Sequence, residues 1–299
     1  MKYVLLGGGG VLGSGFREVL QRRRETVQWV RPDWADASDV RSTLRERVPQ
    51  MVAGAGPATV IWAAGVGSIG ASPAQLGTET AGVRALCEGL ASLPRQERAE
   101  LSVVFASSAG ALFGGAGPAV VQEEAEPRPV TAYGHEKLVQ EDLLRQFADR
   151  TSCRVLICRL SNVYGLAKDR LTARGLVSTA VRATRLRQPM VVYVKPDTRR
   201  DYIYNADAAA VSLHLLRSAP EGCSKALIRD GGTRTVSSVL DLVGAVSGRR
   251  VPASYADRPE TRLQPPVLRF CPPTRGPDEV RRTPMETALH RMVYAPLGA

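Results

Sequence analysis

The chain has 299 residues, with 40 Lys and Arg against 29 Asp and Glu and a formal net charge of +11. A hydrophobic fraction of 44% and a charged fraction of 23% are ordinary for a globular protein and exclude a wholly disordered or collagen-like chain. No apolar run approaches the roughly 18 residues of a membrane helix, and the opening MKYVLLGGGG reaches glycine too early for a signal-peptide core. We therefore expect a cytoplasmic protein with no membrane contact.

The basic excess is almost entirely arginine, since only five of the 40 basic residues are Lys. Nucleic-acid binding would need a clustered basic stripe or a reading motif, whereas the longest basic run, residues 22–24, ends a predicted helix, where cations suit the helix dipole. We expect no nucleic-acid partner. The five cysteines are scattered and lack zinc-like spacing to the three histidines, so we expect no metal site either.

Strands and helices alternate along the first half of the chain. Apolar runs without alternation, such as residues 59–64, are typical of parallel strands buried on both faces. This order predicts an α/β fold with a Rossmann-like, doubly wound parallel sheet. The predicted elements are strand 3–6, helix 14–24, strand 26–30, helix 37–48, strand 59–64, helix 74–93, strand 101–106, helix 132–150 and strand 154–159.

The pattern loosens after about residue 160, where Pro and Gly become more frequent. Helices are still predicted at 207–218 and 237–246. We expect two parts, a Rossmann domain at 1–160 and a smaller, irregular substrate-binding lobe at 161–299. Strands 191–193 and 226–228 are candidates to return to the main sheet.

The first chemical motif is a glycine-rich turn between the first strand and the first helix. Gly7, Gly10 and Gly13 have the spacing G-x-x-G-x-x-G and enclose Val11 and Leu12. Glycines let the backbone approach a pyrophosphate, and the helix N-terminus offers unpaired N–H groups and partial positive charge. The position of this turn in an alternating strand–helix pattern predicts a dinucleotide site.

The end of the second predicted strand bears on which dinucleotide is bound. An acid there hydrogen-bonds the 2′-hydroxyl of NAD, whereas an Arg accommodates the 2′-phosphate of NADP. Arg31 stands at this place, and no acid follows before Asp33. NADP(H) is therefore favoured over NAD(H). The alternative is that Arg31 is one exposed arginine among many.

The second motif is Tyr133–Gly134–His135–Glu136–Lys137. Tyr and Lys four residues apart share a helix face. A Tyr that exchanges protons near neutrality needs its pKa lowered by about 3 units, or roughly 4 kcal/mol. An ammonium about 5 Å away, at an effective dielectric near 20, supplies about 3 kcal/mol. The pattern indicates a phenolic acid/base, and the alternative is a half-exposed helix face.

In these motifs the chain resembles the extended short-chain dehydrogenase/reductases that act on nucleotide sugars as epimerases, dehydratases and ketoreductases. The matching segments are GGGGVLG, DWADASDV, VIWAAG, VVFASSAGALFG, AYGHEK, CRLSNVYG and RRDYIYNADAA. The resemblance implies that Tyr133 is the catalytic acid/base, that Lys137 binds the nicotinamide ribose and that Ser108 contacts the reacting oxygen. It also implies cofactor contacts at Gly7, Gly10, Val11, Leu12, Gly13, Arg31, Asp33, Trp34, Ala63, Ala64, Gly65, Tyr133, Lys137 and Leu160.

By the same resemblance, Asn162, Arg200 and Arg258 would bind the diphosphate of a nucleoside-diphosphate sugar. Asn162 has the alternative of a strand-end cap, and Arg200 that of a local ion pair with Asp201. The resemblance further implies a homodimer through a bundle of helices 74–93 and 132–150.

The chain departs from the family pattern at several positions. The family's Ser/Thr position falls on Ala109, so Ser108 takes that role only if the turn is shifted by one residue. Phe113 replaces the usual Tyr, and Glu79 stands at the place of an Asn. The connection between the second strand and Asp33 is very short, which resembles sugar-nucleotide 4-ketoreductases more than epimerases.

The leading hypothesis is NADP(H)-dependent reduction of a keto group, at C4 of a nucleoside-diphosphate deoxysugar. The first alternative is a redox-neutral, NAD-dependent nucleotide-sugar epimerase. The second is a non-catalytic, cofactor-sensing or scaffold member of the fold. A 4,6-dehydratase is disfavoured because Ala109–Gly110 replaces the acid pair it would need.

Overall fold

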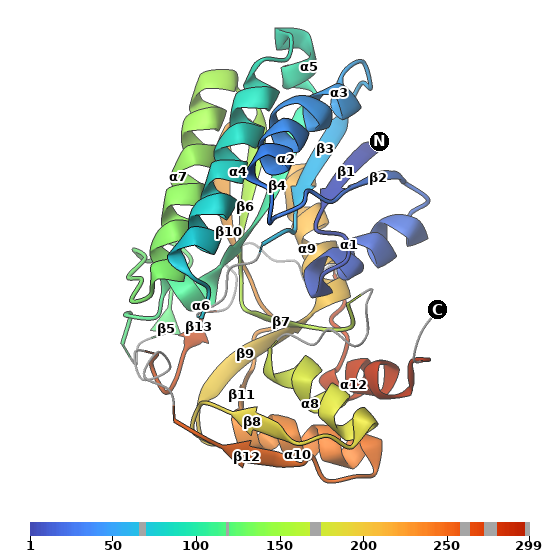
Figure 1. Ribbon diagram of the computed structural model, residues 1–299, viewed down its shortest axis with the longest axis vertical. Coiled ribbons are helices and arrows are strands. Elements are labelled where there is room, and N and C mark those ends of the chain that lie inside the picture. Colours follow the sequence, from blue (N-terminus) through green and yellow to red (C-terminus); the bar gives the residue numbers. More distant parts are fainter. Residues whose placement is uncertain (66–69, 118–119, 168–174, 258–263, 272–279, 297–299) are drawn as a thin grey trace.

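The computed structural model describes residues 1–65, 70–117, 120–167, 175–257, 264–271 and 280–296 (Figure 1). Its centre is a six-stranded, wholly parallel sheet in the order β10-β6-β4-β3-β1-β2. This confirms the expected Rossmann-like, doubly wound sheet. The strands are β1 (Lys2–Leu6), β2 (Thr26–Val30), β3 (Ala58–Trp62), β4 (Leu101–Ser108), β6 (Arg154–Leu160) and β10 (Cys223–Ile228).

The chain reverses its direction of travel across the sheet between β1 and β3. It runs from β1 out to the edge strand β2, returns to β3 and then proceeds through β4 and β6 to β10. In open α/β sheets, the crevice at the carboxyl ends of the strands beside such a reversal is where ligands bind. Every residue of β3 is buried, as expected for a strand covered on both faces.

Helices cover both faces of the sheet (Figure 1). On one face, α1 (Val11–Arg22) packs against α9 (Asn205–Ser218). On the other, α4 (Pro73–Ala91) packs against α7 (Ala132–Thr151). The predicted helix 37–48 is interrupted by a π-helical turn, so this region divides into α2 (Ala37–Ser42), η1 (Thr43–Arg47) and α3 (Val48–Val52). A short α5 (Arg95–Ala99) precedes β4.

Smaller sheets and helices, most of them from the second half of the chain, lie below the main sheet in Figure 1. Strands β11, β9 and β7 form one sheet, β12 pairs with β8, and β13 pairs with β5. These elements are β5 (Val120–Val121), β7 (Asn162–Tyr164), β8 (Met190–Val192), β9 (Arg199–Tyr204), β11 (Thr233–Thr235), β12 (Ala253–Tyr255), β13 (Arg269–Phe270), α6 (Ala109–Leu112), α8 (Leu176–Leu186), α10 (Val236–Ser247) and α12 (Met285–Tyr294).

The two candidates for strands returning to the main sheet had different outcomes. Residues 226–228 lie in β10, which pairs with β6 at the sheet edge. Residues 191 and 192 lie in β8, which pairs with β12, so the expectation that this segment joins the main sheet was wrong. A short β-branched run cannot specify its partner strand, because pairing depends on distant segments. The division at residue 160 stays a prediction.

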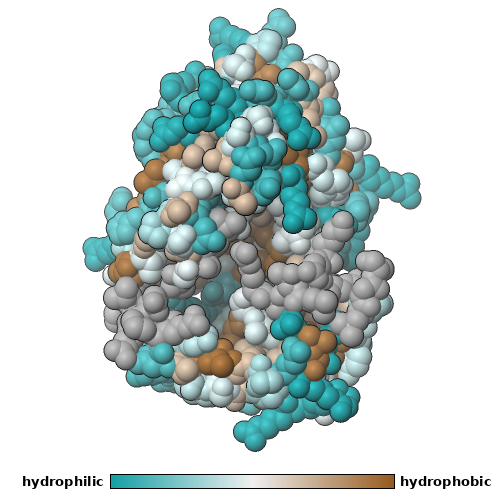
Figure 2. All heavy atoms as spheres, viewed as in Figure 1, coloured by the Kyte–Doolittle hydropathy of each residue, from teal (hydrophilic) through white to brown (hydrophobic). Residues whose placement is uncertain are grey.

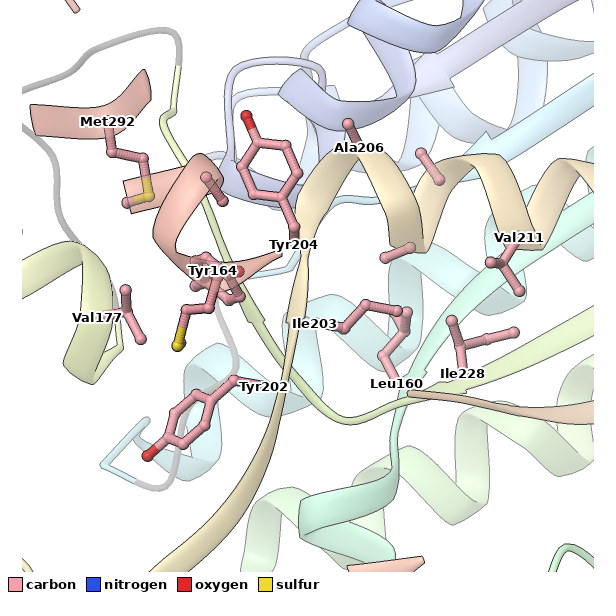
Figure 3. Packing of buried hydrophobic residues seen from close by; sticks show 14 of the residues in the cluster. Leu160, Tyr164, Val177, Tyr202, Ile203, Tyr204, Ala206, Val211, Ile228 and Met292 are labelled. Atoms are coloured by element: carbon pink, nitrogen blue, oxygen red, sulfur yellow. The ribbon is translucent and has the colours of Figure 1, made fainter. Parts of the chain in front are cut away.

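One apolar cluster joins the lower elements to the main sheet (Figure 3). Leu160 and Ile228, at the ends of β6 and β10, belong to the same buried cluster as Ile203 of β9. The rings of Tyr164 and Tyr204 lie 5.7 Å apart within it. Because this packing is continuous, it fixes the lower elements relative to the carboxyl ends of the parallel strands.

Asn205, at the start of α9, connects the lower elements to the first helix. Its side-chain amide donates to the Val11 carbonyl at 2.8 Å and to the Leu166 carbonyl at 3.4 Å. Gly15 makes this approach possible, since a Cβ there would lie 2.3 Å from the Asn205 carbonyl oxygen. The N-terminus of α1 is therefore held at a fixed distance from β9. Within the described ranges, no helix has the length and apolar character to span a bilayer.

Two glycines on α4 provide a matched test of its packing. A Cβ at Gly89 would lie 2.3 Å from the backbone oxygen of Arg45, whereas a Cβ at Gly77 would meet nothing within 4 Å. Gly89→Ala is expected to lower the free energy of unfolding by about 1–3 kcal/mol through overpacking. Gly77→Ala is expected to raise it by about 0.5–1 kcal/mol through helix propensity. Urea unfolding measures both, and changes of the same sign would contradict the packing described.

Candidate active site

The glycine turn lies at the carboxyl end of β1 and is closely packed. Gly7 has φ +81°, and a Cβ there would lie 2.5 Å from the backbone of Ala63 and Ala64. A Cβ at Gly13 would lie 2.1 Å from the Gly7 carbonyl oxygen, so the first turn of α1 rests directly on the loop. These positions accept only glycine without moving the backbone.

The N-terminus of α1 fits a pyrophosphate. Its N-cap is Gly10, which makes no side-chain capping bond, so the first N–H groups, at Val11 and Leu12, are not capped by a side chain. A helix N-terminus with a glycine-lined approach is a favourable place for an anion. Gly65 follows β3 beside this turn and has φ +158°. The residues present therefore fit a dinucleotide at the expected position.

Arginine and tryptophan side chains lie beside the glycine turn at the sheet edge. The Arg17 guanidinium stands over the Trp29 ring, 5.0 Å from its centroid. A Cβ at Gly8 would lie 2.6 Å from that ring, so Trp29 lies directly against the turn. Arg31 is exposed two residues beyond Trp29, immediately after β2. Arg17 was not predicted as a site residue, although its place one turn after Gly13 on α1 was a usable signal.

The short connection after β2 is a turn held by hydrogen bonds between its own residues. The Asp33 carboxylate accepts a hydrogen bond from the Ala35 N–H at 3.0 Å, and the backbone N–H of Asp33 donates to the Asp39 carboxylate at 2.7 Å. Trp34 packs edge-to-face against the buried Trp62 ring, with centroids 5.9 Å apart. Trp34 and Asp33 thus form a compact turn at the sheet edge, close to Arg31 in the chain.

Ser108 and Tyr133 are brought together at the carboxyl end of β4. Tyr133 lies in the first turn of α7, which Thr131 caps by accepting from the Gly134 N–H at 3.1 Å. A hydrogen bond with Ser108 acts to lower the pKa of Tyr133. Ala109 is instead fully buried among apolar residues. The hydroxyl next to Tyr133 therefore comes from Ser108, although the family spacing points to Ala109.

Lys137 is buried and paired with Glu79 of α4. Its Nζ lies 2.8 Å from Glu79 Oε1, and the side chains are only 4% and 1% exposed. Nζ also donates to Gln140 Oε1 at 2.9 Å. It lies 5.7 Å from the centroid of the Tyr133 ring. The ammonium therefore stands beside the phenol, with a carboxylate in direct contact.

The pKa of Tyr133 is raised, contrary to the sequence-based expectation of a lowered value. Burial is the largest cause, because it disfavours the phenolate. Lys137 lowers the pKa of Tyr133 as expected, but Glu79 raises it. Burial alone would lower the pKa of Lys137, yet Glu79 and Tyr133 raise it overall. The spacing of Tyr133 and Lys137 along α7 predicted an ammonium beside the phenol. It gave no sign of the Glu79 carboxylate, which comes from α4.

A second buried ion pair lies one turn further along α7. Glu141 Oε2 accepts from Arg159 Nη2 at 2.8 Å, and Glu141 Oε1 accepts from the Ser107 hydroxyl at 2.6 Å. The Arg159 guanidinium stands over the Phe113 ring, 5.6 Å from its centroid. Glu141 was not among the predicted site residues, although it shares a helix face with Lys137. Ser107 is occupied in this network, which leaves Ser108 to face Tyr133.

The residues expected to bind diphosphate lie along β7 and β9. The Asn162 amide donates to the Asp201 carbonyl at 3.0 Å. Arg200 is buried, and its guanidinium donates to the Arg199 carbonyl at 2.8 Å and to Gln264 Oε1 at 3.3 Å. Burial lowers the pKa of Arg200.

The ion pair suggested for Arg200 and Asp201 is not formed. Within the described residues, the Asp201 carboxylate accepts instead from the backbone N–H groups of Asp230 and Gly231. Arg258 lies outside the described residues. Leu160, the remaining cofactor candidate, is buried at the end of β6 opposite Ser108. The part of the chain that is described holds no cluster of three metal-binding side chains.

Residues 3–226 match the model of the NAD dependent epimerase/dehydratase family. The chain belongs to this family. It is 31% identical over 176 residues to a UDP-glucose 4-epimerase of Azospirillum brasilense, covering 54% of this chain and 51% of the relative. It is 30% identical over 142 residues to a dTDP-L-rhamnose 4-epimerase of Burkholderia thailandensis, covering 47% and 37%. These matches span about half of the first relative and less of the second.

Solved structures share the fold over nearly the whole chain. The UDP-glucose 4-epimerase of Thermus thermophilus, in complex with NAD, superposes with a TM-score of 0.80 at 22% identity, covering 98% of both chains. The Thermotoga maritima UDP-glucose 4-epimerase with UDP-glucose gives 0.79 at 19% identity, covering 98% of this chain and 97% of that one. At these identities, the likeness establishes the fold.

The buried Lys137–Glu79 pair makes a stability prediction. Lys137→Met leaves the Glu79 carboxylate buried without this ammonium and is expected to lower the free energy of unfolding by about 3–5 kcal/mol. Adding Glu79→Leu should recover most of that loss. Arg145→Met removes an exposed cation paired with Asp142 and should cost far less, because solvent screens that pair. Urea unfolding at pH 7 measures all of these, and equal losses for Lys137→Met and Arg145→Met would contradict the pairing.

Proposed function

We propose that this protein moves a hydride between a nicotinamide dinucleotide and C4 of a nucleoside-diphosphate sugar, with Tyr133 moving the accompanying proton. The observation that carries the proposal is the pair of hydroxyls, Ser108 and Tyr133, at the carboxyl end of β4. Beside it, the glycine turn at the end of β1 has the geometry that accepts a pyrophosphate.

Each residue has a distinct part in this chemistry. A bound nicotinamide supplies or accepts the hydride. Ser108 donates a hydrogen bond to the reacting sugar oxygen, and Tyr133 gives a proton to that oxygen or takes one from it. Lys137 holds the nicotinamide ribose and stabilises the phenolate when it forms. Arg200 and Asn162 lie on neighbouring strands and suit the diphosphate side of the substrate.

Net reduction of a 4-keto group by NADPH is the first candidate for the overall reaction. Arg31 follows β2 where an acid would select NAD, and Arg17 stands nearby over Trp29. These guanidinium groups suit the 2′-phosphate of NADPH. The raised pKa of Tyr133 also favours a phenol that donates its proton. A deoxysugar nucleotide is the substrate that fits this reaction.

Redox-neutral 4-epimerisation with NAD is the second candidate. The curated relatives at about 30% identity are 4-epimerases of nucleotide sugars, which favours this reaction over ketoreduction. A non-catalytic, cofactor-sensing protein is disfavoured, because such a protein has no need of the buried Lys137 beside Tyr133.

We also propose that two copies of the chain form a homodimer through α4 and α7. These helices pack side by side, and their outer surface carries small or apolar exposed residues such as Ala81 and Val139. Figure 2 shows hydrophobic patches between hydrophilic ones on the face that carries α4. Sedimentation at micromolar concentration should give twice the mass of one chain, and a monomer would contradict this expectation.

Tyr133→Phe tests the chemistry directly. Removing the hydroxyl is expected to lower kcat at least 100-fold, in line with the roughly 10²–10⁴ contributed by a general acid, while dinucleotide binding is kept. Turnover of a nucleoside-diphosphate 4-ketohexose should consume one NADPH per sugar reduced. Unchanged activity in Tyr133→Phe would contradict the mechanism. Turnover of a 4-hydroxy sugar nucleotide without net cofactor consumption would identify the epimerase instead.

Arg31→Asp tests the choice of cofactor. The wild-type protein is expected to prefer NADPH to NADH, and the variant should shift the ratio of their kcat/KM values toward NADH at least tenfold, because a carboxylate repels the 2′-phosphate and accepts from the 2′-hydroxyl. Arg150→Asp, with the same charge change at the far end of α7, is the control. An equal effect of both substitutions would contradict the role of Arg31.

A further inference from the structure

Glu79 reaches into the site from a helix that supplies none of the proposed catalytic groups. Its carboxylate contacts Lys137 at 2.8 Å and is almost wholly buried. On its other side lies Gly65, where a Cβ would stand 3.1 Å from Glu79 Oε2. The carboxylate is therefore enclosed between the end of β3 and the start of α7. A charged group in such a place has a strong effect on its neighbours, because little water screens it.

Among the described residues, the other two acidic groups of α7 near the phenol have partners of their own. On α7, Glu136 accepts a hydrogen bond from the Thr80 hydroxyl at 2.5 Å, and Glu141 pairs with Arg159 of β6. From β4, the neighbouring groups are the uncharged hydroxyls of Ser107 and Ser108. Among the described residues, the charges that act most on Tyr133 are those of Lys137 and Glu79.

We propose that Glu79 is a positioning residue that cancels the ammonium charge beside Tyr133 and keeps the phenol protonated, so that the site gives a proton to a carbonyl oxygen rather than taking one from a hydroxyl. This inference rests on the proposed function and specifies its direction. An unpaired Lys⁺ would favour the phenolate, which is the base needed to oxidise an alcohol. The Lys137–Glu79 pair is close to neutral, so the phenol remains an acid.

With the hydride that a bound nicotinamide would supply, a C–H bond would form at the sugar carbon as the C=O π bond breaks, and Tyr133 would give its proton to the oxygen. The carbonyl is reduced to an alcohol, and NADPH is oxidised to NADP⁺. Tyr133 is left as a phenolate beside Lys137 and regains its proton from solvent before the next turnover. Glu79 takes no part in bond making.

The titration of Tyr133 tests this proposal without any substrate. Tyrosinate absorbance is followed against pH, and the curve of Tyr133→Phe is subtracted to isolate Tyr133 from the other seven of the 8 tyrosines. In the wild-type protein the phenol should titrate above the ordinary range of Tyr, in line with its raised pKa. In Glu79→Gln its transition should fall by at least one pH unit, a tenfold loss of proton affinity. Glu136→Gln, an equal charge change one turn away, should leave it unmoved.

Two results would overturn the proposal. One is ionisation of wild-type Tyr133 near neutrality, which needs no Glu79 variant and so does not depend on whether Glu79→Gln folds. The other is a Glu79→Gln transition that coincides with that of the wild type or lies above it. Glu79→Asn repeats the test with a shorter amide.

A kinetic measurement separates this proposal from the proposed function. If a 4-ketosugar nucleotide is reduced, Glu79→Gln should move the alkaline limb of the pH–rate profile to lower pH by at least one unit. Absence of any turnover in the wild-type protein would refute the function, whereas the titration of Tyr133 would still decide the role of Glu79.

Discussion

An ammonium buried between a parallel sheet and its covering helices requires a carboxylate in contact with it, and the arrangement of this site follows from that requirement. For Lys137 of α7, that carboxylate is Glu79 of α4, so the ion pair connects the two helices. Lys137 also donates to the Ala106 carbonyl of β4 at 3.5 Å. Three elements thus meet at one charged contact. Tyr133, one turn before Lys137, is held against the end of β4, where Ser108 faces it.

The second constraint is the attachment of the lower elements to the sheet. Asn205 bonds the first residue of α1, and the apolar cluster around Ile203 and Tyr204 continues from β6 into β9. Because α1 and β9 are fixed together, the glycine turn at one side and Arg200 at the other keep a constant separation. On the proposed function, a dinucleotide and a sugar nucleotide meet between them, at the end of β4. The separation of these two parts of the site is therefore set by packing rather than by the loops alone.

The sequence predicted what local patterns determine. The strand–helix alternation identified the sheet, and the spacing of Tyr133 and Lys137 identified a shared helix face. Features that depend on distant residues were not predicted from the sequence, such as the partner of β8 and the π-helical turn in the segment 37–52. The direction of the Tyr133 pKa was also missed, because it depends first on burial in the fold and then on Glu79, which is 58 positions from Lys137 in the chain. Counting residues pointed to Ala109, whereas the fold buries Ala109 and turns Ser108 to the phenol.

On the proposed function, one dinucleotide and one sugar nucleotide meet at Tyr133. A crystal structure with the nicotinamide cofactor and a nucleoside-diphosphate hexose would show whether they do. We expect the pyrophosphate on the Gly7–Gly13 turn, the nicotinamide C4 about 3–3.5 Å from sugar C4, and the Tyr133 hydroxyl within hydrogen-bond distance of the oxygen on that carbon. A dinucleotide bound elsewhere, or a sugar whose C4 oxygen lies beyond the reach of Tyr133 and Ser108, would contradict it.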